Sequence, residues 1–366
     1  MAAEAGGTYD PTQNRELDTR SEKTVLELDP TRYVHRNSGT GDGHTYPGWY
    51  FGQWKDYRDL PAAPFVTEYG AQGLSVKESI LRTFPQYGPD AGHAELIRFK
   101  AWLETQGNYQ AILWLKKHLG NRIFRLERNP IFQPLINWLK QWGMKNKGYP
   151  YSKIPSRDNT PRELHPAREV WENWRFHDFQ PQETFEDGRV SPGKCLEEFV
   201  NSSQTYQSHL IQYATECYRR NKYSKVTGIF QFDFTDPWPA ITWSVLDYWR
   251  VPKPAFEALR RAMQPILPIF DFPDDLKAGK AFTARCCAVN DLTRAFPGAK
   301  FAWSLHGNGK IIKHGEWLMD MEADTVTTTR KVKMPALEEG AFQFDVMLTS
   351  AGGKPLGENH YEIHVE

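Results

Sequence analysis

The spacing of apolar residues changes at Pro265, and this change divides the chain into two regions with different expected folds. Downstream of Pro265, short runs such as AFTARCCAVND, KFAWSLHG and AFQFDVMLTS alternate apolar and polar residues between Gly, Pro and Asp turns. Alternation with a period of two is typical of strands that bury one face. Residues 265–366 are therefore predicted to form an all-β sandwich of immunoglobulin-like size and pattern.

Residues 1–264 have a different pattern of apolar residues, in which short apolar runs without alternation are separated by segments with helical spacing. The strand-like runs are Thr31–His35, Pro64–Thr67 and Val226–Phe234. Non-alternating strands are typical of a parallel sheet that is covered on both faces. Helices are predicted over residues 14–28, 196–220 and 254–263 from the spacing of their apolar residues. The predicted fold class is α/β, as part of a TIM barrel, followed by the sandwich.

A helical insertion is predicted at about residues 90–165. Its runs AELIRFKAWLETQGNYQAILWLKKHLG and PIFQPLINWLKQWG carry apolar residues at helical spacing. A polar, proline-rich segment follows them and is predicted to be an exposed loop. These helices could cover a cleft, or they could pack as ordinary core helices.

Charge and cysteine content exclude several classes of function. Lys plus Arg and Asp plus Glu each number 45, which argues against a nucleic-acid or anionic-membrane partner. No apolar run approaches the ~18 residues that a membrane span needs. The four cysteines form no C-x-x-C pair, so we expect free thiols, a reducing compartment and no metal site. Together with the lack of a signal-peptide pattern, the free thiols favour a cytoplasmic location, while that of the full protein stays open.

The stretch PFVTEYGAQ places a carboxylate, Glu68, at the end of an apolar strand. Catalytic groups of TIM-barrel enzymes lie at the C-terminal ends of the strands. A carboxylate there could attack the anomeric carbon of a sugar, and retaining glycosidases use two carboxyl groups ~5–5.5 Å apart for this chemistry. An acid in this position could also cap the next helix.

Three further clusters bear on this choice. Asp42 and His44 lie in a Gly-rich loop, where the backbone can approach a ligand closely; a metal site would need a third ligand, which is not obvious nearby. In DPWPAITWSVLDYW, Trp238 lies between two prolines that stiffen its backbone and favour a fixed aromatic wall. The segment WENWRFHDFQPQETF contains His177 and Asp178, and either loop packing or a cleft lining would explain it.

Three motifs resemble glycoside hydrolase family 2, in its β-mannosidase-like and exo-glucosaminidase-like branches. They are LDPTRYVHRNSGTGDGH, PFVTEYGAQ and GIFQFDFTDPWPAITWSVLDYWRVPKPAFEAL. The resemblance runs from about Asp10 to Met263, and the sandwich fits the C-terminal immunoglobulin-like domain of the family. It implies a hydrolase of carbohydrate metabolism, a retaining exo-glycosidase acting on β-linked sugars without metal or organic cofactor.

The resemblance also implies the roles of individual residues. Glu68 matches the nucleophile of the S/T-E-Y/F-G motif, and Trp238 resembles the aromatic wall beside the cleavage point. The implied substrate-binding set is Asp42, His44, Trp49, Tyr69, Gln72, Asp236 and Trp238.

The chain departs from the family pattern in two places. The last barrel strand reads Q-F-D-F-T-D at 231–236 where β-mannosidases read F-W-Q-L-N-D, which leaves mannoside preference open against β-galactosidase, β-glucuronidase and glucosaminidase specificity. In the family, the acid/base Glu follows an Asn at the end of barrel strand four. No such Asn-Glu strand end is present in this sequence. We therefore expect the second half of a hydrolase, whose partner would be the missing N-terminal half or a further copy of the chain. A non-catalytic carbohydrate-binding or complementing fragment is the alternative.

Overall fold

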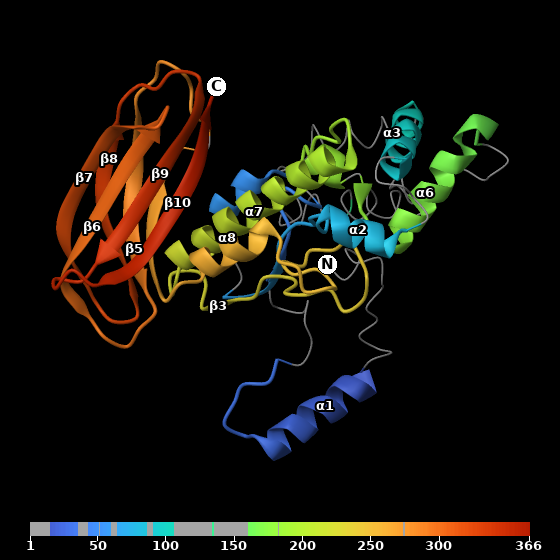
Figure 1. Ribbon diagram of the computed structural model, residues 1–366. Helices are drawn as coiled ribbons and strands as arrows, with labels where there is room; N and C mark the ends of the chain where they lie inside the picture. The colour runs from blue at the N-terminus through green and yellow to red at the C-terminus, as the bar shows by residue number, and fades with distance from the viewer. Residues whose placement is uncertain are drawn as a thin grey trace. The chain divides into compact units, whose positions relative to one another are not determined.

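The computed structural model describes residues 15–35, 43–50, 52–59, 64–85, 91–105, 134, 160–181, 183–273 and 275–366. The chain divides into two compact units (Figure 1). The first comprises Met1–Leu210 and Lys225–Lys253, and the second comprises Ile211–Ser224 and Pro254–Glu366. Each unit is described by itself. Most of the predicted insertion, including its second helical run, lies outside the described residues.

The first unit is of mixed α/β type. Its helices and strands are α1 (Arg15–Leu28), β1 (Gly43–Thr45), the 3-10 helix η2 (Trp54–Arg58), β2 (Phe65–Tyr69), α2 (Lys77–Thr83), α3 (Ala91–Glu104), the 3-10 helix η4 (Arg162–Leu164), α6 (His165–Phe176), the π-helical turn η5 (Glu183–Asp187), the first part of α7 (Leu196–Arg220) and β3 (Gly228–Ile229).

The strands of this unit form a three-stranded parallel sheet in the order β1-β2-β3. His44 on β1 is opposite Glu68 on β2, and Val66 on β2 is opposite Ile229 on β3. Because the three strands run in the same direction, their carboxyl ends meet at one edge. The prediction of parallel strands around Glu68 is confirmed.

Aromatic and aliphatic side chains from α2, α3, α6 and α7 form the apolar core of the first unit. Phe99, Trp171 and Phe199 are almost fully buried at its centre. Helix α6 begins with a proline in its first turn, where the missing N–H costs little. Of these helices, α3 and α7 were predicted from their apolar spacing, whereas α2 and α6 were not.

The second unit is built around two antiparallel sheets. Its elements are the end of α7, α8 (Pro254–Ala262), β4 (Ile266–Asp271), β5 (Phe282–Asn290), β6 (Phe296–Gly307), β7 (Lys310–Met321), β8 (Thr325–Met334), β9 (Gly340–Thr349) and β10 (Pro355–Val365). The sheets have the orders β4-β5-β8 and β10-β9-β6-β7. Phe301, Trp303 and Phe344 lie in the core between them. The predicted sandwich pattern after Pro265 is confirmed.

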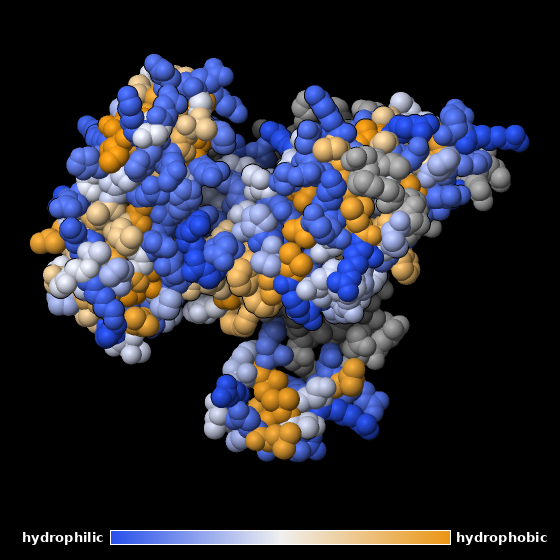
Figure 2. Space-filling view, viewed as in Figure 1, coloured by the Kyte–Doolittle hydropathy of each residue, from blue (hydrophilic) through white to orange (hydrophobic). Residues whose placement is uncertain are grey.

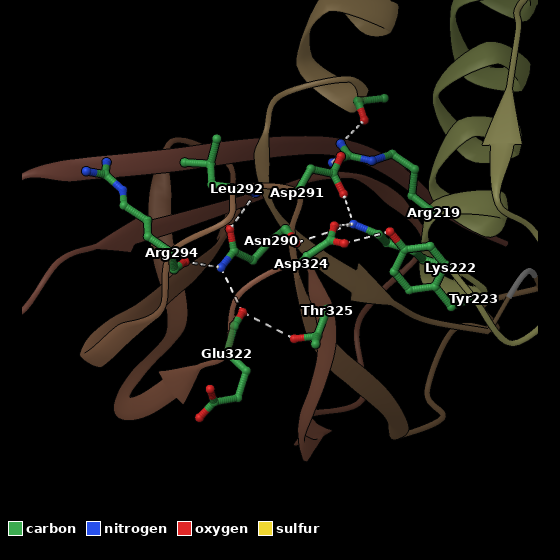
Figure 3. Close-up of polar contacts among 11 residues, drawn as sticks. Arg219, Lys222, Tyr223, Asn290, Asp291, Leu292, Arg294, Glu322, Asp324 and Thr325 are labelled. Carbon is green, nitrogen blue, oxygen red and sulfur yellow. Dashed lines mark hydrogen bonds and ion pairs between the residues drawn. The ribbon is translucent and has the colours of Figure 1, made fainter. Parts of the chain in front are cut away.

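A charged network explains why residues 211–224 belong to the second unit (Figure 3). The Lys222 ammonium donates to Asp291 and Asp324, at 2.6 Å in each case. The Arg219 guanidinium donates to Asp291 at 2.7 Å, and the Tyr223 hydroxyl donates to Asp324 at 2.7 Å. The end of α7 is thereby joined to two loops of the sandwich.

Two of the predicted strands were wrong in extent or in kind. Residues 31–35 form a turn and an extended tail, because Asp29 accepts a hydrogen bond from the Thr31 backbone N–H at 3.1 Å, and Tyr33 is 89% exposed. In the predicted strand Val226–Phe234 only Gly228–Ile229 forms a strand, β3, and Phe230 and Phe234 are exposed rather than buried.

The prediction of free thiols agrees with the structure. All four thiols are free, and the adjacent Cys286 and Cys287 face opposite sides of β5, in two different apolar clusters. Helix α1 exposes Leu17, Val25, Leu26 and Leu28. Figure 2 shows hydrophobic side chains in orange on this helix. None of the helices in the described ranges has the length and apolarity to cross a bilayer.

Candidate active site around Glu68

Glu68 lies one residue before the end of β2, with a side chain that is about one quarter exposed. The Tyr46 hydroxyl donates a hydrogen bond of 2.9 Å to its Oε2. Nδ1 of His44 lies 3.3 Å from the same oxygen. Both partners come from β1 and the residue just after it. The carboxylate is thus held in one orientation by the neighbouring strand and remains partly open to solvent.

Aromatic contacts hold Tyr46 in place. Its ring packs edge-on against Tyr50 at 5.4 Å and against Trp243 at 6.4 Å, measured between ring centroids. Trp243 in turn contacts Phe232, which follows β3. A hydroxyl on a packed ring is a rigid donor, since little side-chain entropy remains to be lost when it binds the carboxylate.

The segment after β3 lies against the end of β2. The Phe232 backbone N–H donates to the carbonyl of Tyr69 at 3.0 Å, and the Gln231 side chain donates to the carbonyl of Trp243 at 3.1 Å. Gly70 allows this close approach, because a Cβ there would lie 2.9 Å from the Phe232 carbonyl oxygen, and its φ is +149°. The residues next to Glu68 and those before Asp233 are therefore in backbone contact.

Three carboxyl groups near this segment are pushed toward the protonated form. Burial raises the pKa of Asp233 to about 6, and the charge of Asp236 adds to this shift. Burial raises the pKa of Asp178 to about 6 as well, again with a contribution from Asp236. The pKa of Asp236 itself is raised by burial, although the nearby Lys253 ammonium opposes this shift.

Lys253 is buried, and burial lowers the pKa of its ammonium group. It donates to the Gly73 carbonyl at 2.7 Å and to the Ser244 hydroxyl at 3.2 Å. These bonds connect the loop after Glu68 to the loop that follows the D-P-W-P motif. The ammonium therefore has a clear structural role in fixing both loops.

Four of the predicted substrate-binding residues are buried in the structure. Trp49, Tyr69 and Asp236 have no exposed surface, and Gln72 is 2% exposed. The Gln72 amide donates to the Asp178 carbonyl at 2.6 Å and accepts from the Gln180 backbone N–H at 3.0 Å. Asp236 accepts a hydrogen bond from the Thr242 hydroxyl. Gln72 and Asp236 are therefore hydrogen-bonded within the protein, and the predicted contact of all four residues with a sugar stays a prediction.

Trp238 is 40% exposed and lies in a group of aromatic rings. Its ring is 5.4 Å from that of His177 and 6.1 Å from that of Phe176. His177 is fixed by a contact between its Nδ1 and the Pro239 carbonyl. An exposed, supported tryptophan of this kind fits an aromatic wall. The His177 ring contacts both Trp238 and the buried Phe84, with 4.6 Å between the ring centroids of His177 and Phe84.

The structure brings together Glu68 and His44 from the predicted set, whereas Asp42 lies outside the described residues. Sequence analysis missed Tyr46, although a signal was present. Side chains two positions apart in an extended segment point to the same face, so Tyr46 shares its direction with His44. The raised pKa of Asp233 could not be predicted, because it depends on burial.

Searches with family models gave no match. A 73-residue segment is 33% identical to β-mannosidase B of Aspergillus flavus and covers 19% of this chain and 9% of that protein. The corresponding protein of Aspergillus niger is 29% identical over the same length, with the same coverage. The β-D-mannosidase of Dictyoglomus thermophilum has a similar fold, with a TM-score of 0.53 and 18% identity, covering 96% of this chain and 35% of the enzyme.

The chain resembles the C-terminal part of a β-mannosidase-like hydrolase of glycoside hydrolase family 2. The predicted resemblance is thereby confirmed. The chain spans about a third of the D. thermophilum enzyme, and the matched segment is about a tenth of the fungal proteins.

Proposed function

We propose that this chain is the C-terminal part of a retaining exo-glycosidase that acts on β-linked sugars, with Glu68 as its nucleophile. The observation that carries the proposal is the setting of Glu68. Its carboxylate lies near the end of a parallel strand, partly open, with Oε2 held by Tyr46 and His44. The other oxygen, Oε1, is the atom available for attack.

The chemistry takes place in two steps. A Glu68 oxygen bonds to the anomeric carbon while the bond from that carbon to the leaving oxygen breaks, and an acid protonates this oxygen. Water then attacks the anomeric carbon, breaks the bond to Glu68 and gives its proton to the same acid/base group. We assign the acid/base role to a residue outside this chain, because the family motif that carries it matches none of its segments.

The finer architecture is part of the same proposal. The parallel order β1-β2-β3 is what neighbouring strands of a TIM barrel would have, with Glu68 at the barrel mouth. The sandwich of β4-β5-β8 against β10-β9-β6-β7 is consistent with an immunoglobulin-like domain. Trp238 would form the aromatic wall.

The residue at position 235 bears on which sugar the proposed enzyme prefers. The position of the β-mannosidase Asn is Thr235, whose hydroxyl accepts a hydrogen bond of 2.8 Å from Arg250. A hydroxyl used in this way is less available to a sugar than a free amide. This observation favours testing galactosides, glucuronides and glucosaminides beside mannosides.

The experiment is chemical rescue of Glu68→Ala with activated dinitrophenyl β-glycosides, whose leaving group needs no proton. We expect the variant to lose on the order of 10⁴-fold in rate. Azide should restore turnover and give the α-glycosyl azide, because azide enters from the face that Glu68 vacates. The exposed Glu78→Ala serves as the control. Wild-type rates in Glu68→Ala would overturn the assignment of Glu68 as the nucleophile. Sugar binding without turnover in the wild type would favour a non-catalytic carbohydrate-binding fragment.

A further inference from the structure

The outer face of the sheet β10-β9-β6-β7 carries a row of polar residues that is aligned across the strands. His360 is opposite Asp345, Asp345 is opposite Ser304, and Ser304 is opposite His314. The neighbours Trp303 and Phe344 point into the core of the sandwich, so these four side chains point the other way. Directly opposed residues lie close enough to interact.

Asp345 is the centre of this row. Its Oδ1 lies 2.8 Å from Nδ1 of His360, and its Oδ2 lies 3.3 Å from Nε2 of His306. The Gln343 amide donates to both carboxylate oxygens, at 2.9 and 3.1 Å. The Ser304 hydroxyl lies 2.7 Å from the same His306 nitrogen. The polar side chains are thus fixed in position before any ligand arrives.

A cavity of about 590 Å³ is lined by three members of this row, Ser304, Asp345 and His360, and its volume is within the range of small-molecule sites. It is lined by Arg261, Ala302, Trp303, Ser304, Asp345, Val346, Met347, Glu358, Asn359 and His360. Figure 2 shows mainly hydrophilic residues over the sandwich, with hydrophobic ones interspersed.

Two of the lining residues have charged groups that lack a protein partner. Across the described ranges, neither the Arg261 guanidinium nor the Glu358 carboxylate makes a hydrogen bond or an ion pair. Both face the same cavity and yet do not pair with each other. Polar groups that converge on a cavity without partners are available to a ligand.

The side chains that line the cavity indicate which kind of ligand it can bind. Arg261 disfavours a cation, while Asp345 and Glu358 disfavour an anion. Donors and acceptors are mixed, and the 37% exposed Met347 adds an apolar surface. A pyranose ring has this combination, with hydroxyls around its edge and an apolar face of C–H groups. We propose that this cavity of the second unit binds one sugar unit of a neutral oligosaccharide.

A transition-metal ion is the competing ligand, because imidazoles and a carboxylate are common metal ligands. His306 and His360 approach different oxygens of Asp345. In the part of the chain with described structure, no three such residues converge in a geometry that could hold a metal ion. The sugar is therefore the better supported occupant.

Calorimetric titration of the whole chain with manno-, cello- and chito-oligosaccharides of two to four units tests this proposal. We expect saturable binding that weakens at least tenfold in Arg261→Ala and in His360→Ala. His364→Ala, on the same strand but outside the cavity lining, should bind like the wild type. Circular dichroism establishes that each variant is folded.

Absence of binding to every oligosaccharide, or wild-type affinity in both cavity variants, would overturn the proposal. Zinc binding that is lost in His360→Ala, without any sugar binding, would replace the sugar by a metal. Covalent labelling of Glu68 should be unchanged in Arg261→Ala. Failure of the sandwich site and failure of the proposed glycosidase function are therefore distinguishable.

Discussion

The Tyr46 hydroxyl donates a hydrogen bond of 2.9 Å to the Glu68 carboxylate across the gap between the end of β1 and β2. This contact joins two segments 22 residues apart in the sequence. It leaves the carboxylate partly exposed, yet oriented. In the proposed mechanism it determines which Glu68 oxygen is presented to the sugar.

Removing this hydroxyl should slow formation of the glycosyl-enzyme. A hydrogen bond to a charged group is worth about 1.5–3 kcal/mol, so Tyr46→Phe should lower the rate constant of Glu68 glycosylation about 10- to 100-fold. The matched control is Tyr57→Phe, which removes a 2.9 Å bond to the Thr45 carbonyl on the same strand without contacting Glu68. Equal losses in both variants would mean that Tyr46 only stabilises β1.

Trp238 should contribute to binding rather than to stability, because its ring is 40% exposed. Stacking against a sugar is worth about 1 kcal/mol, so Trp238→Ala should weaken binding of a competitive sugar inhibitor about five- to tenfold. Trp238→Phe should restore part of this loss. The exposed Phe230→Ala, whose ring contacts Phe65, is the control and should leave the inhibition constant unchanged. An unchanged inhibition constant in Trp238→Ala would show that Trp238 does not form an aromatic wall.

Asp178 and Asp233 should make the fold less stable as the pH rises. Each has a folded pKa of about 6 against an ordinary value of 3.8. Between about pH 4 and pH 6 the folded chain keeps protons that the unfolded chain has released, so the free energy of unfolding falls with rising pH in this window.

Asp233→Asn should reduce the total fall in the free energy of unfolding between pH 4 and pH 6 by on the order of 1 kcal/mol, once solvent screening is allowed for. Urea unfolding at pH 4, 5, 6 and 7 measures the effect. The exposed Asp59→Asn should retain the wild-type slope. A slope that persists unchanged in Asp233→Asn would assign the pH dependence to other groups.

Lys222 should stabilise the second unit, since it binds Asp291 and Asp324 at once. The carboxylates are partly exposed, so we expect Lys222→Ala to lower the free energy of unfolding by only about 1 kcal/mol. The exposed Lys280→Ala, a loop variant in the same unit, should have no effect. Urea unfolding at low and high salt measures the difference, which should shrink in high salt.

Sequence patterns predicted the elements whose structure depends on local spacing. Helix α7 begins and ends where the apolar periodicity predicted, and the alternating runs after Pro265 became strands. The Thr31–His35 prediction was wrong because β-branched and aromatic residues favour strands only where a partner strand pairs with them. There the Asp29 side chain forms a turn instead.

The sequence predicted those parts of the candidate site that depend on strand direction. Glu68 and His44 could be placed at one sheet edge from the sequence. The burial of Trp49 and Asp236 could not, because burial depends on how segments pack together and not on local spacing. The cavity on the sandwich also escaped prediction, since it combines Arg261 of α8 with residues of three strands.

The most direct test of the central claim is covalent trapping with a dinitrophenyl 2-deoxy-2-fluoro β-glycoside, followed by mass mapping of the labelled peptide. The fluorine slows hydrolysis of the intermediate, and the leaving group needs no acid. The account predicts one added glycosyl group, carried by Glu68 on the peptide with the sequence FVTEYG. A label on any other residue, or turnover of the parent glycoside without a trapped intermediate, would contradict it.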